Sequence, residues 1–213
     1  MRRIALLALI ACGDKRQADP VTPGSSTVVA LDAAPVVEPS RIALRAGGKP
    51  PVKTTKPIGR EQLTTLSTLE LAGLTARVRK LDDAFLDVEY TLALPIVVGV
   101  TVQPCLRCLP MRVDTWRAET DALRVTVPPE LRDRSEGTSF EVTSSVLGGA
   151  TVIATYQLAV VPGAFDQAVT VYWNDGVNQL RVSARSTGKD GDVERRELEQ
   201  LALAVLDRYA QSW

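Results

Sequence analysis

Two cysteines near the middle of the chain have the spacing of a bridging or reactive pair. Cys105 and Cys108 are two residues apart, with Pro104 before them and Pro110 after them. The spacing allows a structural disulfide, a thiol-disulfide redox centre or half of a metal site. A redox centre normally has its first cysteine at a helix N-terminus, and Pro110 disfavours helix just beyond the pair, although Arg107 would lower a thiol pKa. Zinc needs four ligands and the pair supplies two. We therefore expect a structural disulfide and keep redox chemistry as the alternative.

Other chemistry is limited because the 213-residue chain contains no histidine. This excludes Ser-His-Asp and Cys-His catalysis and every histidine-ligated metal site. Asp82, Asp83, Asp87 and Glu89 form an acidic cluster that could supply paired carboxylates. Asp82-Asp83 is typical of a turn, however, and the alternation predicts that Asp87 and Glu89 lie on the solvated face of a strand. Residues 190–194 alternate acidic side chains as calcium loops do, yet later ligands are missing and a turn before a helix explains them equally well. We expect no catalytic residue, no metal and no cofactor.

Two aromatic residues are the candidates for contact with a partner. Tyr172 and Trp173 precede Asn174-Asp175-Gly176, which has the composition of a tight β-hairpin turn. Adjacent strand residues point to opposite faces of a sheet, so we expect one ring in the core and the other exposed. The exposed ring is the predicted contact residue.

The pattern of apolar residues predicts the elements that position these groups. Alternation indicates strands near 74–79, 86–94, 138–146, 150–160, 169–173 and 180–184, with an apolar run at 96–102 that is typical of a buried strand. The stretch 116–127 is ambiguous, and Leu123, Val125 and Val127 favour a strand. At the C-terminus the period changes to that of a helix, since Leu198, Leu201, Ala202, Val205 and Tyr209 share one face. Asp192 is a candidate N-cap for this helix.

These elements predict an α+β fold: an antiparallel sheet of about seven strands with a C-terminal amphipathic helix packed on one face. The order of hairpin, last strand and closing helix resembles the PsbP/Mog1-like lipoproteins. This resemblance lies in the order of the elements, and no diagnostic motif accompanies it.

The first residues have the composition of an export signal. Arg2 and Arg3 precede an apolar run at 4–11 that is too short to span a bilayer, and Cys12 follows directly. Leu9-Ile10-Ala11-Cys12 resembles the lipobox of bacterial lipoproteins. The resemblance implies a signal peptide over 1–11, cleavage before Cys12, and attachment of acyl chains such as palmitate to that cysteine. It also implies a bacterial cell-envelope location, and Gly13 favours the periplasmic face of the outer membrane over the inner membrane.

The segment 12–60 is predicted to be a disordered tether that carries the lipidated Cys12. It holds seven of the 13 prolines and no aromatic residue, so it buries too little apolar surface to fold. Between Ser40 and Arg60 it has six basic and no acidic residues. This stretch either contacts anionic lipid headgroups or is a solubilising linker that rests loosely on the acidic domain. Residues 61–213 are predicted to form that single α+β domain.

The sequence therefore predicts a membrane-anchored cell-envelope lipoprotein that acts as a non-enzymatic binding or structural module. The expected partners are the membrane, through the lipid anchor, and an envelope protein, glycan or lipid. Nucleic acid is not expected, because 25 basic residues balance 25 acidic ones. The alternative is an envelope thiol-disulfide redox protein that uses Cys105 and Cys108.

Overall fold

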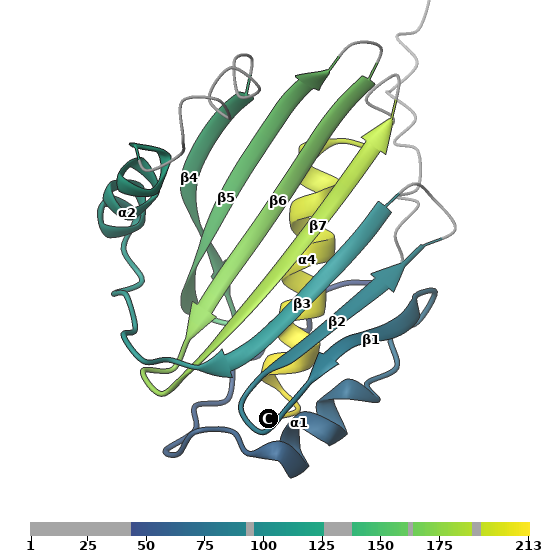
Figure 1. The fold of residues 1–213 in the computed structure, drawn as a ribbon, viewed down its shortest axis with the longest axis vertical. Helices are drawn as coiled ribbons and strands as arrows, with labels where there is room; N and C mark the ends of the chain where they lie inside the picture. The colour runs from purple at the N-terminus through teal and green to yellow at the C-terminus, as the bar shows by residue number, and fades with distance from the viewer. Residues whose placement is uncertain (1–43, 93–95, 126–137, 162–163, 189–192) are drawn as a thin grey trace, which may run out of the picture. The chain divides into compact units, whose positions relative to one another are not determined.

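The computed structural model describes residues 44–92, 96–125, 138–161, 164–188 and 193–213. It has one seven-stranded antiparallel sheet, in the order β1-β2-β3-β7-β6-β5-β4 (Figure 1). Two meanders, β1–β3 and β4–β7, meet where β3 pairs with β7. The α+β prediction of about seven strands and a C-terminal helix is confirmed. The strands are β1 (Thr75–Leu81), β2 (Leu86–Thr91), β3 (Ile96–Pro104), β4 (Thr138–Leu147), β5 (Ala150–Val161), β6 (Ala164–Asn174) and β7 (Asn178–Gly188).

The two predicted turns form where glycine allows a left-handed backbone. Gly148 and Gly149 connect β4 to β5 with φ of 55° and 85°, and Gly176 has φ of 93° in the β6–β7 turn. The carboxylate of Asp175 accepts hydrogen bonds from the backbone N–H of Val177 (2.8 Å) and of Asn178 (2.7 Å). An aspartate in this position stabilises the turn as an Asx motif.

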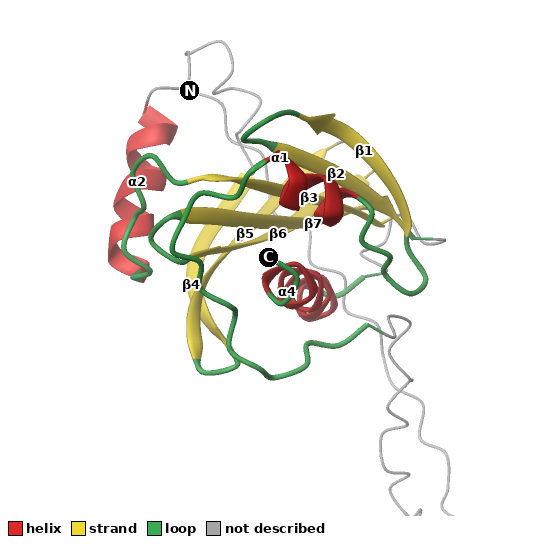
Figure 2. Cartoon of the chain, turned by 90° about the horizontal axis from the view of Figure 1, so that it is seen from below, coloured by secondary structure: helices red, strands yellow, loops and turns green. Residues whose placement is uncertain are grey.

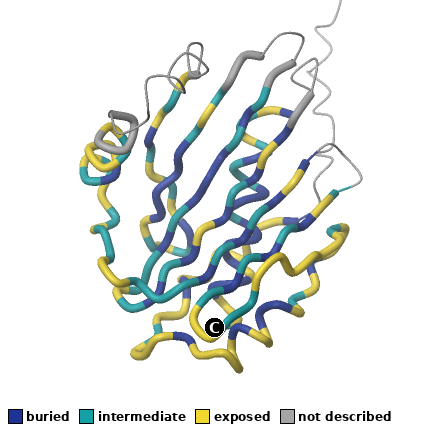
Figure 3. Tube along the Cα trace, in the orientation of Figure 1, coloured by how far each residue is buried: buried dark blue, intermediate teal, exposed yellow. Residues whose placement is uncertain are grey.

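The apolar run at 96–102 forms a half-buried strand. Ile96, Val98 and Val100 are buried, whereas Val97 is 38% exposed. The expectation of a buried strand therefore holds for one side of β3 only, because buried residues alternate along it with half-buried or exposed ones (Figure 3). The uncovered side becomes important for the functional site.

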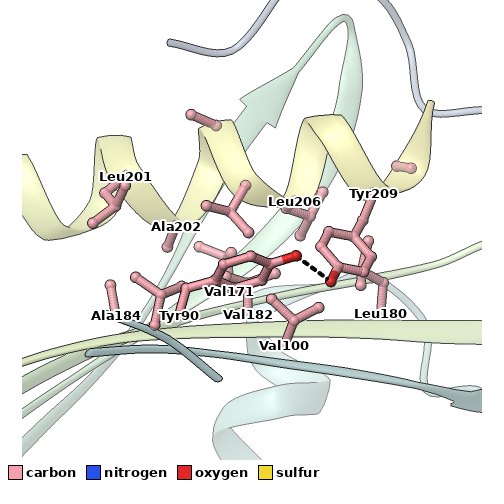
Figure 4. Packing of buried hydrophobic residues seen from close by; sticks show 14 of the residues in the cluster. Tyr90, Val100, Val171, Leu180, Val182, Ala184, Leu201, Ala202, Leu206 and Tyr209 are labelled. Atoms are coloured by element: carbon pink, nitrogen blue, oxygen red, sulfur yellow. Dashed lines mark hydrogen bonds between the residues drawn. The ribbon is translucent and has the colours of Figure 1, made fainter. Parts of the chain in front are cut away.

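The core lies between the sheet and α4 (Arg195–Ala210), which crosses the sheet on the far side in Figure 1. The helical face predicted from the sequence is the buried one. Its side chains are at most 1% exposed: Leu198, Leu201, Ala202, Val205 and Tyr209. They pack on valines and leucines of β3, β6 and β7 (Figure 4). Burial of this stripe contributes roughly 25 cal/mol for each Å² of apolar surface removed from water.

One hydrogen-bonded chain crosses this apolar core. The Tyr90 hydroxyl on β2 donates to the backbone oxygen of Leu69 (2.9 Å) and lies 2.7 Å from the Tyr209 hydroxyl on α4 (Figure 4). Since Tyr90 has one proton and gives it to Leu69, Tyr209 donates to Tyr90. Burial raises the pKa of both tyrosines above the ordinary value. The chain of bonds fixes the position of α4 along the sheet.

The N-terminal boundary of the domain lies earlier than predicted. Residues 44–58, here called the strap, run along the side of α4 that faces away from the sheet (Figure 2). Gly47 N–H donates to the buried Asp207 carboxylate (2.6 Å), and Val52 N–H donates to the Ala210 oxygen (3.0 Å). Leu44 and Ile58 are buried in the core. The prediction of a disordered tether as far as residue 60 was thus wrong for 44–60, because backbone hydrogen bonds to α4 compensate for its low apolar content.

Two helices were not predicted. The helix α1 (Arg60–Ser67) follows the strap and buries Leu63 and Leu66. The helix α2 (Val113–Val125) replaces the strand favoured for 116–127. The alternation of Leu123 and Val125 is compatible with a strand, but the segment is a helix whose Trp116 ring is buried. Asp192, the predicted N-cap of α4, lies outside the described residues, and Glu194 is the residue that precedes the first turn.

The tyrosine pair predicts an asymmetric effect of two matched substitutions. Tyr90→Phe leaves both the Leu69 carbonyl and the Tyr209 hydroxyl without a partner, so we expect a loss of about 3 kcal/mol in the free energy of unfolding. Tyr209→Phe leaves no hydrogen-bond donor without a partner, so we expect it to lower the free energy of unfolding by only about 1 kcal/mol. Urea denaturation measures both. Equal losses would contradict the direction of donation.

The strap predicts a loss of stability in acid. Burial raises the pKa of Asp175, but hydrogen bonds from Thr54 and from the backbone of Asn178 and Val177 outweigh it and hold the pKa below 3.8. The stabilisation is therefore present above about pH 4 and is lost as the pH falls through the lowered folded-state pKa. Asp175→Asn should be less stable than the native chain at pH 7, with a difference that shrinks by pH 2. A constant difference across this range, measured by urea denaturation, would show that the carboxylate does not hold the strap.

Candidate functional site

The sheet face opposite α4 is only partly covered. The helix α2 packs near the β4 edge, where Trp116, Val142 and Ile153 form a small buried cluster. Across β6, β7, β3 and β2 no described helix lies on this face, which faces the viewer in Figure 1. This open region is the candidate functional site.

The open face contains a groove of about 380 Å³ near the end of the sheet where β6 turns into β7. Strand register explains why these residues share it: Asp87 pairs with Thr101, Thr101 with Arg181, and Arg181 with Tyr172. Residues paired across an antiparallel sheet point to the same side. The seven lining residues are Phe85, Asp87, Thr101, Gln103, Tyr172, Gln179 and Arg181.

The polar side chains of the groove lack partners within the described part of the chain. Asp87, Thr101, Gln103, Gln179 and Arg181 make no side-chain hydrogen bond or ion pair to any described residue. The nearest interaction is the Arg181 guanidinium over the Tyr172 ring, 5.8 Å from its centre. All five side chains are therefore free to bind a ligand or water.

Two arginines elsewhere on the same face, Arg185 and Arg79, are paired with carboxylates. Arg185 Nε donates to Asp166 (2.7 Å), and this hydrogen bond raises the pKa of Arg185. Arg79 donates to Glu89 (2.8 Å) across β1 and β2. The groove differs from its surroundings because its opposite charges, Asp87 and Arg181, do not pair with each other.

The predicted aromatic contact residues have different positions. Trp173 is 3% exposed and packs on Trp213, with ring centres 5.3 Å apart, so it belongs to the core. Tyr172 is half-buried on the groove wall, between Trp116 (4.5 Å between ring centres) and Arg181. Of the pair, only Tyr172 is placed to contact a ligand.

Cys105 and Cys108 form a disulfide in the loop that leaves β3. Cys105 N–H donates to the oxygen of Val177 (2.8 Å), which ties this loop to the β6–β7 hairpin. The next helix, α2, begins only at Val113, so the N-terminus of a helix does not stabilise a Cys105 thiolate. The geometry thus supports a structural bridge. Among the described residues no third metal ligand lies near it.

The acidic cluster does not form a catalytic pair. Glu89 bonds Arg79, Asp82 bonds Lys80 (3.2 Å) and Asp83 bonds Arg60 (3.0 Å), which leaves Asp87 in the groove. In the segment 190–194, residues 190–192 lie outside the described residues, as does Cys12. The lipid site on Cys12 therefore remains a prediction, and the choice between a turn and a calcium loop at 190–194 is not tested.

Three lining residues of the groove were not predicted as site residues: Arg181, Gln103 and Gln179. Each occupies a polar position in an alternating strand, which is the signal that could have identified an outward face. Their proximity could not be derived, because it depends on the pairing of β3 with β7 across more than 70 residues of chain.

One gap between the described parts of α4 and the sheet is too small to hold a ligand. It is lined by Leu66, Val102, Leu180, Tyr209 and Trp213 and has no room for a water molecule. Packed side chains leave no volume for a lipid chain in this gap.

Fold and site together define an α+β domain with a filled core on one sheet face and a polar groove on the other. No known protein-family model matches the chain, and no curated protein matches it in sequence. Within the described ranges, no helix is long and apolar enough to cross a membrane. Fold and groove geometry must therefore support the functional assignment.

We expect removal of the disulfide to leave the domain folded. The bridge joins residues with a sequence separation of 3, so it closes a very short loop and restricts the unfolded chain little. The double variant Cys105→Ser, Cys108→Ser should lose about 2 kcal/mol or less in urea denaturation. Loss of cooperative unfolding in this variant would show that the bridge is essential to the fold.

Proposed function

We propose that this protein is a binding module of the bacterial cell envelope, held at a membrane by lipid on Cys12, and that its groove receives a polar ligand. The observation that carries the proposal is a set of five polar side chains in one groove that make no hydrogen bond or ion pair to the described residues. Four of them, Asp87, Thr101, Gln103 and Gln179, are half-buried, and Arg181 is exposed. Polar groups that converge on a concavity in this way are typical of sites that bind a ligand.

The composition of the groove favours binding over catalysis. Asp87 is the one carboxylate that lines the groove, and the Thr101 hydroxyl on the neighbouring strand makes no hydrogen bond to it. A hydrolase of the two-carboxylate type needs a second acid on the opposite side of the bond that is cleaved. Polar side chains also make the groove unsuitable for an acyl chain, so a polar small molecule, peptide or glycan is a better ligand than a lipid tail.

The direction in which the chain enters the domain is compatible with a membrane anchor. The strap lies on the α4 side of the sheet, opposite the groove. Between Cys12 and Leu44 there are 31 residues. An anchored domain could therefore keep its groove clear of the incoming chain. The lipobox-like residues Leu9-Ile10-Ala11-Cys12 support the anchor itself.

Metabolic labelling with radioactive palmitate tests the anchor. The native chain, expressed in a bacterium, should incorporate label and fractionate with membranes, because several acyl chains hold a protein firmly to a bilayer. Cys12→Ser should lose both properties, while Cys105→Ser serves as a matched control and should keep them. Unchanged labelling and membrane association in Cys12→Ser would overturn the proposed location.

A further inference from the structure

We propose that the groove binds a small zwitterion of dipeptide size, with its carboxylate on Arg181 and its ammonium group on Asp87. This inference rests on the proposed function, because it names the ligand of that same groove. Four features of the groove carry it: an unpaired cation, an unpaired anion, the strand between them, and the free amides alongside.

Arg181 is positioned to receive a carboxylate. Its guanidinium makes no ion pair with a described residue and lies over the Tyr172 ring. That ring is itself held against Trp116, so the aromatic surface beneath Arg181 is fixed. A guanidinium presents parallel N–H groups that match the two oxygens of a carboxylate.

Asp87 is positioned to receive an ammonium group. Its cross-strand neighbour Lys80 is bonded to Asp82 instead (3.2 Å), which leaves the Asp87 carboxylate without a cation among the described residues. An ionised carboxylate in a half-buried position is stabilised by a cationic partner. A ligand ammonium group would supply it.

The separation of the two charges sets the size of the ligand. Asp87 is on β2 and Arg181 is on β7, and both are register partners of Thr101 on the intervening β3. Their Cα atoms are therefore about 10 Å apart, which is two strand spacings. The charged ends of an extended dipeptide are about 6 Å apart, so it bridges the two side chains as they lean toward it. The groove volume of about 380 Å³ is also near the lower end of ligand sites.

The remaining lining residues suit the middle of such a ligand. Gln103 and Gln179 are paired across β3 and β7, and their carboxamides can both donate to and accept from a peptide group. Phe85 and Tyr172 provide apolar surface at the two ends of the groove. Each ring already has a cation over one face, Lys80 at 4.8 Å from Phe85 and Arg181 at 5.8 Å from Tyr172. A phosphate would be repelled by Asp87.

Calorimetric titration of the full chain with alanylalanine at pH 7 tests the proposal. We expect saturable binding that weakens about tenfold or more when the ammonium group is removed by N-acetylation. A similar loss is expected when the carboxylate is converted to an amide. Equal affinity for all three probes would overturn the assignment of charges.

Single substitutions assign each end of the ligand. The Arg181→Gln variant should bind alanylalanine more weakly than the native chain does, with an affinity equal to its affinity for the amide. The Asp87→Asn variant should bind alanylalanine and its N-acetyl form with equal affinity. Arg185→Gln is the matched control, because Arg185 lies on the same strand and face but is bonded to Asp166. Thermal unfolding of the three variants should resemble that of the native chain, since these side chains do not support the core. Loss of binding in Arg185→Gln alone would contradict the proposed position.

A second measurement separates this inference from the proposed function. Amide NMR signals of the full chain are recorded with alanylalanine and, separately, with the polar small molecules of a bacterial envelope extract. Shifts around Thr101 and Arg181 with the extract but not with alanylalanine would reject the zwitterion and keep the binding module. Absence of groove shifts in both cases would reject both proposals.

Discussion

Burial of one sheet face beneath α4 is the constraint on which the rest of the structure depends. A seven-stranded antiparallel sheet has two faces, and the apolar stripe of α4 covers only one of them. The Tyr90–Tyr209 hydrogen bond fixes that helix at one position along the sheet, since a shift would leave buried hydroxyls without partners. Because α4 meets the demand for a core, the opposite face can carry polar side chains without loss of stability.

The β6–β7 hairpin connects the two sides of the domain. Asp175 and Asn178 bind the strap through Thr54, Lys56 and Ile58. In the same hairpin, Val177 accepts a hydrogen bond from Cys105 of the disulfide loop. The start of β7, which carries Gln179 and Arg181, is therefore held by both the strap and the disulfide loop. Pre-organised side chains lose less entropy when they bind, which is what a small polar site requires.

Charge placement on the open face separates structural groups from groups available to a ligand. Arg185 and Arg79 are neutralised by neighbouring carboxylates, and exposed pairs of this kind contribute little to stability. Arg181 and Asp87 lie in the same groove without closing on each other, because β3 separates their strands. The arrangement maintains two opposite charges at a fixed spacing, which is a simple basis for selectivity between ligands.

Residues close together in the chain were enough to predict the strand pattern, the β6–β7 turn, the amphipathic face of α4 and the cysteine pair, because each of these features is local. The ordered strap could not be predicted, because it is held by hydrogen bonds to a helix more than 150 residues away. The helix α2 was not predicted either, because its alternating apolar residues also fit a strand. The groove was also decided by tertiary structure alone. Its residues come from β2, β3, β6 and β7, and only the pairing of β3 with β7 brings Asp87 and Arg181 onto one surface.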